Sequence, residues 1–374
     1  MAYSPRFQYH HAMVHRLMEI ERHREFSEHV RIPAVADLRM RQQARQRSTH
    51  SSTLIEGNPI ARRSIAATIA DRGRSQSQAQ MEVRNYWRAL EWIAEAVADE
   101  TQPGEELVTR LHAIVFAGAK GRPRERSKYR NVQIAVFSGA TGAIDYMAPE
   151  PHDVPALMRD FAGWWSGPAA REIPAPLRAG IVAYQFVTIH PFPDGNGRTA
   201  RALATYELWR SGYAFRGYLA LEDYYARDLA AYYGALQMDL HHNYYFGRND
   251  PDLTRWMDYF TSTLLEGARE VRRATEAELG KPAAANPLQG LTRRFENLML
   301  RVVVQASGEG AADGNFTPND VAEWFGVSDR TARDWLQEWS SQGLVEAASG
   351  EQRVRAWRLA GAVGETVRGA LGAV

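Results

Sequence analysis

The chain has 374 residues, of which 45% are hydrophobic, and its 45 Lys and Arg residues nearly balance its 44 Asp and Glu residues. A chain of this length usually folds into two or three domains, and its balanced charge gives no global reason to expect a nucleic acid or an acidic membrane as a partner. Because the sequence contains no cysteine, disulfides, thiolate metal sites and cysteine nucleophiles are excluded.

Residues 1–17 lack the uninterrupted apolar stretch of a signal peptide, and no run of the sequence approaches the length of a bilayer span. The absence of cysteine is compatible with a reducing compartment. The sequence therefore predicts a cytoplasmic protein with no membrane partner.

Most of the first hundred residues are predicted to be helical. In residues 10–30, 35–56 and 80–99, apolar residues recur every three or four positions amid charged ones, as in amphipathic helices. Gly57, which an Asn-Pro pair follows, is expected to end the second helix because glycine readily adopts the left-handed conformation found at helix ends.

A β-hairpin is predicted for the segment from Val132 to Tyr146. Val132, Ile134 and Val136 alternate along its first strand, and the glycines between positions 139 and 142 supply the turn. A single hairpin cannot form a core by itself, so we expect a flap on the surface of a mainly α-helical protein.

Residues 176–192 are apolar almost all round, which predicts a buried central helix. Pro191 ends this helix and leaves His190 at its C-terminal edge. The next helix begins directly after the Gly-Asn-Gly sequence at positions 195–197. The first amides of a helix favour anions, and Gly195 and Gly197 would let these amides turn towards a ligand.

Charged side chains with complementary chemistry surround this predicted anion site. Arg198 and Arg201 lie three residues apart and therefore share a helix face, where two guanidinium groups suit a polyphosphate. Asp194 offers a hard oxygen ligand to Mg²⁺, and the His190 imidazole could accept a proton from an attacking hydroxyl. The alternative is an ordinary turn followed by a solvated helix face.

Residues 190–201, HPFPDGNGRTAR, resemble the Fic family signature H-P-F-x-[DE]-G-N-G-R-x-x-R, and all nine specified positions match. The surrounding segments LHAIVF, YRNVQIAVF, YMAPEPHDVPALMRDFAGWW and YYGAL are similar to the helices and flap of the family. The resemblance extends over residues 40–265, and it implies a mainly α-helical Fic core with a β-hairpin flap.

The resemblance implies transfer of AMP from ATP to a hydroxyl side chain of a protein, with His190 as general base, Asp194 as the Mg²⁺ ligand and Phe192 as a packing residue. The residues implied to contact the phosphates are Gly195, Asn196, Gly197, Arg198 and Arg201. Tyr232 and Tyr233 are candidates for the adenine wall, although paired tyrosines at helical positions also fit a core. The hairpin is expected to dock the target by main-chain pairing at its edge; a purely structural flap is the alternative.

Residues 51–58, SSTLIEGN, have two readings. They could be a simple helix end with an exposed Glu56 and a capping glycine. They also resemble the inhibitory motif of the family, [ST]-x-x-x-E-[GN], with Ser52, Glu56 and Gly57 at the matching positions. Glu56 would then pair with Arg201 and occupy the cation intended for the γ-phosphate, which predicts an autoinhibited enzyme.

The C-terminal residues predict a winged-helix domain, with a helix-turn-helix followed by a two-stranded wing. Arg330 and Arg333 on its second helix are offset by acidic neighbours, whereas Arg353, Arg355 and Arg358 give the wing a modest basic patch. DNA contact and protein docking stay equal alternatives for this domain.

The predicted domains are an N-terminal helical region (1–104), a Fic core (105–275), a linker (276–295) and the winged-helix domain (296–374). The predicted function is a protein adenylyltransferase that uses Mg²⁺ and ATP on a Ser, Thr or Tyr hydroxyl of a protein target, which could include the chain itself. A DNA-binding regulator with a nucleotide-sensing core and an enzyme that removes AMP are the alternatives. The sequence leaves a homodimer open.

Overall fold

The computed structural model describes residues 3–71, 77–118, 126–137, 142–280, 294–295, 298–299, 301–302, 314–348, 356–361 and 363–365. The chain divides into two compact units. The first contains Met1–Val30, Arg47–Ile60 and Gln76–Arg273, and the second contains Arg31–Gln46, Ala61–Ser75 and Ala274–Val374. The second unit thus takes in two short segments from the N-terminal hundred residues, which a division into consecutive domains does not anticipate.

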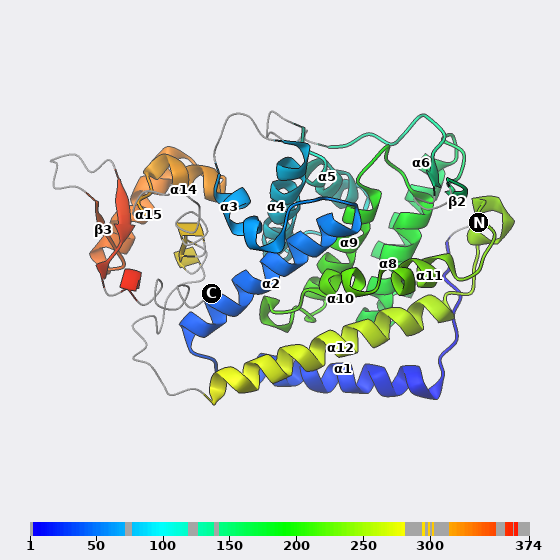
Figure 1. Cartoon of the computed structure of the whole chain (residues 1–374), viewed down its shortest axis with the longest axis horizontal. Helices are drawn as coiled ribbons and strands as arrows, with labels where there is room; N and C mark the ends of the chain where they lie inside the picture. Colours follow the sequence, from blue (N-terminus) through cyan, green and yellow to red (C-terminus); the bar gives the residue numbers. More distant parts are fainter. Residues whose placement is uncertain are drawn as a thin grey trace. The chain divides into compact units, whose positions relative to one another are not determined.

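Helices dominate the described residues, as predicted (Figure 1). The helical segments that contribute to the first unit are α1 (His11–His29), α2 (Ala34–Ile55, whose first residues belong to the second unit), α4 (Gln78–Ala98), α5 (Glu105–Val115), α6 (Val154–Ser166), α7 (Pro168–Arg171), α8 (Ala175–Ile189), α9 (Asn196–Arg210), η2 (Phe215–Gly217), α10 (Leu221–Arg227), α11 (Leu229–Gln237), η3 (Tyr244–Arg248) and α12 (Thr254–Leu279). Among the described residues, no helix combines the length and the apolar character needed to cross a bilayer.

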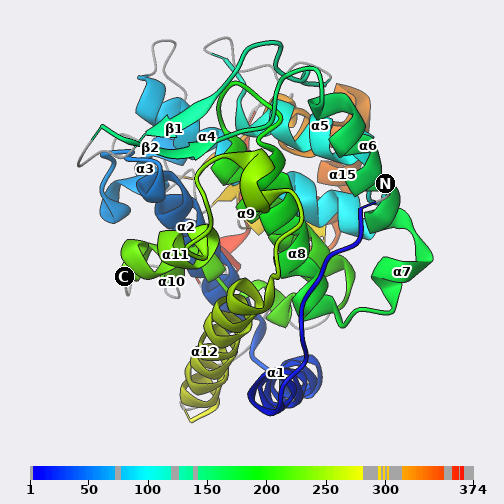
Figure 2. The ribbon, with the colours of Figure 1, turned by 90° about the vertical axis from the view of Figure 1, so that its right-hand side faces the viewer.

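Helix α8 is buried along almost its whole length, which confirms the predicted central helix. It packs against α9, and α4 and α5 cover another side of α9. Figure 2 shows α8 and α9 in the middle, with α1 and α12 side by side below them. His10 and Arg16 fasten α1 to α12, because both side chains bind the Asp258 carboxylate. The site described below lies between α8 and α9, and other helices of the first unit pack around these two.

The predicted amphipathic helix over residues 80–99 forms as α4. Its apolar face is buried, and the reciprocal hydrogen bonds of Ser77 and Gln80 cap its N terminus. The helix predicted over residues 35–56 also forms, as α2, and Gly57 follows it with a φ of 84°. The sequence therefore predicted where this helix ends, next to the proposed inhibitory motif.

Gly180 on α8 faces α12 so closely that a side chain there would push its neighbours aside by a few tenths of an ångström. A methyl group there would lie 3.1 Å from Met257 Cε and 3.1 Å from Phe260 Cγ. We therefore expect Gly180→Ala to lower the free energy of unfolding by about 1–3 kcal/mol, measured by urea unfolding. Gly163→Ala in helix α6 is the matched control, because a methyl group there meets nothing; it should stabilise the protein by about 0.5–1 kcal/mol. Equal unfolding midpoints for Gly180→Ala and the parent would contradict this packing.

The hairpin consists of β1 (Ala135–Phe137) and β2 (Ile144–Met147), which pair antiparallel with an irregularity between Val136 and Phe137. The first strand starts later than predicted, because Val132 and Ile134 precede β1, although the Ile134 carbonyl still accepts a hydrogen bond from Ala148. Residues 138–141 of the predicted turn lie outside the described residues.

One edge of the hairpin is already occupied. The Met147 amide donates to the His242 carbonyl (2.8 Å), and Met147 also forms a parallel bridge with Asn243. In the described part of the chain, no segment pairs with the outer edge of β1. The outer edge of β1 is therefore the edge that another chain could reach.

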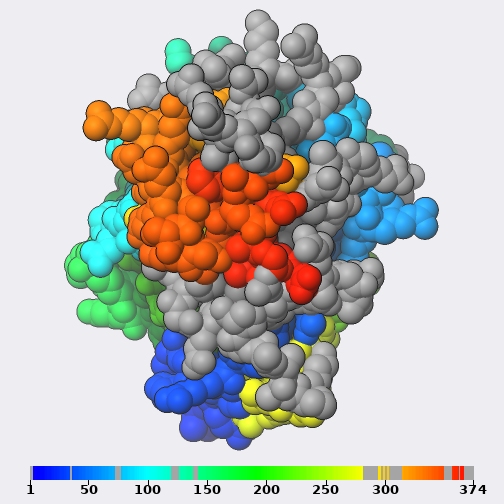
Figure 3. Space-filling view, turned by 90° about the vertical axis from the view of Figure 1, so that its left-hand side faces the viewer, coloured from blue at the N-terminus to red at the C-terminus, as the bar shows by residue number. Residues whose placement is uncertain are grey.

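The second unit contains η1 (Arg62–Ser64), α3 (Ile65–Ala70), α14 (Pro318–Phe325), α15 (Asp329–Ser341) and the antiparallel strands β3 (Val345–Ala347) and β4 (Trp357–Leu359). Figure 3 looks onto the orange and red surface of its C-terminal elements. Gly326 adopts a φ of 63° and ends α14 before the turn into α15. Helix, turn, helix and strand pair follow the predicted order, and the winged-helix assignment stays a prediction.

The basic residues predicted for DNA contact are partly engaged within the second unit. Arg333 pairs with Asp329 (2.6 Å), and Arg358 pairs with Glu346 (2.8 Å). Arg353, Arg355 and most of the predicted linker lie outside the described residues. The described part of this unit therefore gives no observation that favours DNA over a protein partner.

Candidate active site

The loop between α8 and α9 brings the signature residues together. Helix α8 ends at Ile189, and His190 caps it in the left-handed conformation with a φ of 51°. Gly195 also has a positive φ, 76°, and α9 begins at Asn196. Glycine suits this position because a side chain would be strained at that φ, and its Cβ would contact His112 and Phe116.

His190 has the hydrogen bonding of a general base. Its Nδ1 lies 3.1 Å from the Val187 carbonyl, so the neutral ring donates its proton there and leaves Nε2 as the acceptor. Burial lowers the pKa of His190 from its ordinary value of 6.5, although the Val187 carbonyl and the charge of Glu56 oppose this shift. The imidazole is therefore neutral at pH 7 and able to take a proton.

Asn196 fixes the loop from inside. Its side-chain oxygen accepts a hydrogen bond from the Phe192 amide (3.0 Å), and its side-chain nitrogen donates to the Phe192 carbonyl (2.7 Å). Phe192 is fully buried, as expected of a packing residue. The Asn196 side chain thus shapes the loop, while its backbone stands at the start of α9.

Arg201 is held by the end of α2. Its Nε donates to Ser52 Oγ (2.9 Å), and its Nη2 donates to the Ser52 carbonyl (2.8 Å) and to Glu56 Oε1 (2.8 Å). Burial is the largest single influence on the pKa of Glu56 and acts to raise it, but the charge and hydrogen bond of Arg201, together with the charge of Arg198, lower this pKa overall. The same pair raises the pKa of Arg201 despite its burial. Both groups are therefore charged.

The Glu56 carboxylate also lies against the start of α9. A Cβ added to Gly197 would collide with Glu56 Oε1. The Glu56 carboxylate occupies the space that the glycine leaves, and a side chain at this position would displace it. The structure therefore places an anion of the protein itself where the sequence predicts an anion from a ligand.

Asp194 lies in this loop and Arg198 lies in the first turn of α9. The Asp194 side chain is 58% exposed, and its Oδ1 lies 3.6 Å from Arg198 Nη2. In the described part of the chain, no cluster of three or more metal-binding side chains occurs. A single exposed carboxylate fits Mg²⁺, which commonly takes its other ligands from phosphates and water.

Glu82 is a site residue that sequence reasoning missed. Its Oε1 lies 3.5 Å from Arg198 Nη1, and its Oε2 accepts a hydrogen bond from Asn58 (2.8 Å), two residues after Glu56. Each arginine of the signature therefore has a carboxylate beside it. The amphipathic pattern of α4 did not predict the contact with Arg198, because it places Glu82 on the solvent-exposed face of the helix.

His112 is the second residue that sequence reasoning missed. Its Nε2 donates to the Asp194 carbonyl (2.8 Å), and its Nδ1 accepts from Ser127 Oγ (2.6 Å). The ring stacks on Phe192 with 3.7 Å between centroids, and burial lowers the pKa of His112 to about 4. This neutral imidazole supports the loop from below. A histidine within the apolar segment LHAIVF was the available signal.

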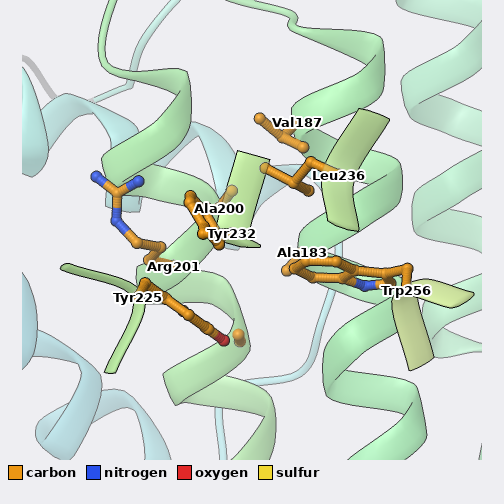
Figure 4. A pocket seen from close by; sticks show the side chains of 9 residues that line it. Ala183, Val187, Ala200, Arg201, Tyr225, Tyr232, Leu236 and Trp256 are labelled. Atoms are coloured by element: carbon orange, nitrogen blue, oxygen red, sulfur yellow. The ribbon is translucent and has the colours of Figure 1, made fainter. Parts of the chain in front are cut away.

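The two tyrosines of α11 differ in their exposure. Tyr232 is buried, stacks on Tyr225 and lines a small pocket with Arg201 and Trp256 (Figure 4). The free space of this pocket is about 10 Å³, enough for about one water molecule and too small for a purine. The structure thus places Tyr232 in the core, whereas Tyr233 is 43% exposed and its hydroxyl donates to the Ile55 carbonyl (3.3 Å).

Residues 102–208 match the model of the Fic/DOC family. The chain is 27% identical over 202 residues to the protein adenylyltransferase Fic of Drosophila grimshawi and 30% identical over 170 residues to that of Nematostella vectensis. These alignments cover 53% and 44% of this chain and 40% and 37% of the relatives. The chain thus spans less than half the length of the curated relatives it matches.

Solved structures show the same fold. A Fic family protein from Desulfovibrio desulfuricans superposes with a TM-score of 0.60 at 23% identity, over 96% of this chain and 99% of that chain. Fic-1 from C. elegans superposes with a TM-score of 0.56 at 22% identity, over 71% of this chain and 73% of that chain. These likenesses confirm the predicted mainly helical fold.

Proposed function

Because residues 102–208 match the model of the Fic/DOC family, we propose that this chain is a protein adenylyltransferase, which transfers AMP from ATP to a Ser, Thr or Tyr hydroxyl of a protein. The observation that carries the proposal is the loop of residues 190–201. It combines a neutral imidazole whose Nε2 is the proton acceptor, the N terminus of a helix and two buried arginines.

In the proposed reaction, the hydroxyl oxygen of the target attacks the α-phosphorus of ATP. The bond between the hydroxyl oxygen and the α-phosphorus forms as the bond to the β-phosphate bridging oxygen breaks, and pyrophosphate leaves. His190 Nε2 accepts the hydroxyl proton. The backbone of residues 195–197 donates hydrogen bonds to the phosphates, Arg198 contacts them, and Arg201 binds the γ-phosphate.

Asp194 would hold Mg²⁺, which when bound neutralises charge on the α- and β-phosphates. Its exposed carboxylate suits this role. His112 helps to position Asp194, because its hydrogen bond to the Asp194 carbonyl fixes the backbone from which the Asp194 side chain extends.

The target segment would dock on the outer edge of β1. This edge is unpaired in the described part of the chain, and Val132, Val136 and Phe137 beside it are exposed by 54%, 40% and 61%. An extended peptide can add to such an edge by main-chain hydrogen bonds, which do not depend on its sequence. The exposed apolar side chains beside the edge would then favour targets with apolar residues near the modified hydroxyl.

Autoinhibition by Glu56 is the second part of the proposal. The carboxylate is bound to Arg201 and lies over Gly197. Arg201, which would bind the γ-phosphate of ATP, is therefore already paired with Glu56. The same carboxylate fills part of the site at which the phosphates would bind. We expect the wild-type chain to be weakly active.

Intact-mass analysis of Glu56→Gly incubated with Mg²⁺ and ATP tests the proposed reaction, beside the same variant carrying His190→Ala. The expected product is a chain, or an added protein acceptor, heavier by one adenylyl group, and its formation should require His190. An increment of a different mass would contradict AMP transfer. Loss of an adenylyl group from a previously modified protein would instead identify the reverse reaction.

A further inference from the structure

A buried arginine outside the signature connects the flap to the catalytic loop. Arg130 is 3% exposed, and all three hydrogen bonds of its guanidinium go to backbone carbonyls. Nε donates to His190 (2.8 Å), Nη1 to Val132 (3.0 Å) and Nη2 to Pro149 (2.5 Å). Val132 precedes the hairpin and Pro149 follows it. One side chain therefore joins both ends of the flap to the residue that carries the base.

The geometry of this contact is rigid. A guanidinium is planar and always charged, so its three nitrogens fix the carbonyls they bind in one plane. In the described part of the chain, the hydrogen bonds of Arg130 include none to a carboxylate, so carbonyl dipoles compensate its buried charge. A lysine could keep the charge but could not reach three separate carbonyls.

Two further contacts join the same elements. The Arg130 amide donates to the Pro191 carbonyl (2.9 Å), one residue after the base. From β2, the Tyr146 hydroxyl donates to the Thr188 carbonyl, and the Tyr146 ring meets the His190 ring edge-on at 6.4 Å. The hairpin and Arg130, which precedes it, are thus bound to the backbone both before and after His190.

We infer that Arg130 is a positioning residue that sets the spacing between the outer edge of β1, where a target docks, and His190 Nε2, which takes the proton. The inference rests on the proposed function, because Arg130 would position the target hydroxyl relative to His190. It would not affect the binding of ATP. A misplacement of about 1 Å between reacting groups can cost about a hundredfold in rate. Loss of the three-way contact should therefore reduce transfer and spare ATP binding.

Arg130 also acts on His190 through its charge. Burial contributes most to the lowered pKa of His190, and the positive charge of Arg130 lowers it further. Removing this charge should therefore raise the pKa of the imidazole. A residue that only held the fold together would not produce this shift in a folded variant.

The first experiment compares Arg130→Lys with its parent, both carrying Glu56→Gly. We expect self-transfer of AMP, followed by intact mass, to be about 10- to 100-fold slower, while the Kd for Mg-ATP changes less than about twofold. Flap amides in β1 and β2 should exchange with deuterium about tenfold faster. Arg126→Lys is the matched control, because Arg126 is an exposed arginine four residues earlier, paired with Glu106, and should change none of these values.

The second experiment follows the His190 imidazole by NMR in Arg130→Met, where the titration should move to higher pH, and in Arg130→Lys, where it should move less. Unchanged flap exchange in Arg130→Lys would overturn the inference, as would a loss of ATP affinity equal to the loss of transfer. If the parent transfers no AMP at all, the proposed function fails, and flap exchange together with the His190 titration still decides the role of Arg130.

Discussion

Replacing Glu56 with glycine is expected to raise the rate of AMP transfer about a hundredfold. A preorganised hydrogen-bond donor to developing negative charge is typically worth about 10²–10³ in rate, and in the proposed restraint Glu56 occupies the Arg201 guanidinium that would supply it. Ser52 accepts two hydrogen bonds from the Arg201 guanidinium, so the guanidinium stays in place once the carboxylate is gone. The substitution should therefore release a preorganised arginine, and the rate of adenylyl incorporation at fixed Mg-ATP measures this.

Glu100→Gly is the matched control for this prediction. Glu100 follows α4 in the left-handed conformation with a φ of 52° and is exposed, so the same change there removes a carboxylate at a helix end away from the loop. It should leave transfer unchanged. A Glu56→Gly variant that transfers AMP no faster than the wild type would rule out the restraint.

Replacing His190 with alanine in the Glu56→Gly background is expected to slow transfer by about 10²–10⁴, the usual contribution of a general base. Nucleotide affinity should change little, because Nδ1 is bound to the Val187 carbonyl and Nε2 faces the acceptor in the proposed reaction. Single-turnover transfer together with a Kd for Mg-ATP separates these effects. Equal rates with and without the imidazole would assign the proton to another group.

The pH dependence follows from the same histidine. The base must be neutral, and burial lowers its pKa below 6.5, so transfer should rise with pH through that lowered value and stay flat from pH 7 upwards as far as His190 is concerned. The effect on stability has the same sign. Between the lowered folded value and 6.5 the unfolded chain binds more protons, so the contribution of His190 to stability is lost as the pH falls through this range.

The local features of the site could be predicted from the sequence, because short-range patterns carry them. Proline and glycine mark the end of α8, the turn at Gly195 and the start of α9. The contact between Glu56 and Arg201 links residues 145 positions apart and was expected only through a family motif. Periodicity alone places Glu56 at a helix end but gives no reason to connect it with Arg201.

The supporting residues could not be predicted, because their partners lie far along the chain. His112 binds a carbonyl 82 residues away, and Arg130 binds one 60 residues away. Every residue has a backbone carbonyl, so the residue types in the sequence do not show which carbonyl will accept such a hydrogen bond. The later start of β1 has a similar cause, since alternation of Val132, Ile134 and Val136 does not say where a partner strand begins.

In the proposed autoinhibition, the Glu56 carboxylate that lies over Gly197 competes with the nucleotide from within the chain. Its concentration at the site is set by the end of α2 and does not vary with the amount of protein. The apparent affinity for ATP is then reduced by the fraction of time that the carboxylate is away, which makes inhibition surmountable by substrate. Under the proposed autoinhibition, the rate of transfer would therefore rise with the ATP concentration, and a partner that moved Glu56 away from Arg201 would lower the ATP concentration needed for transfer.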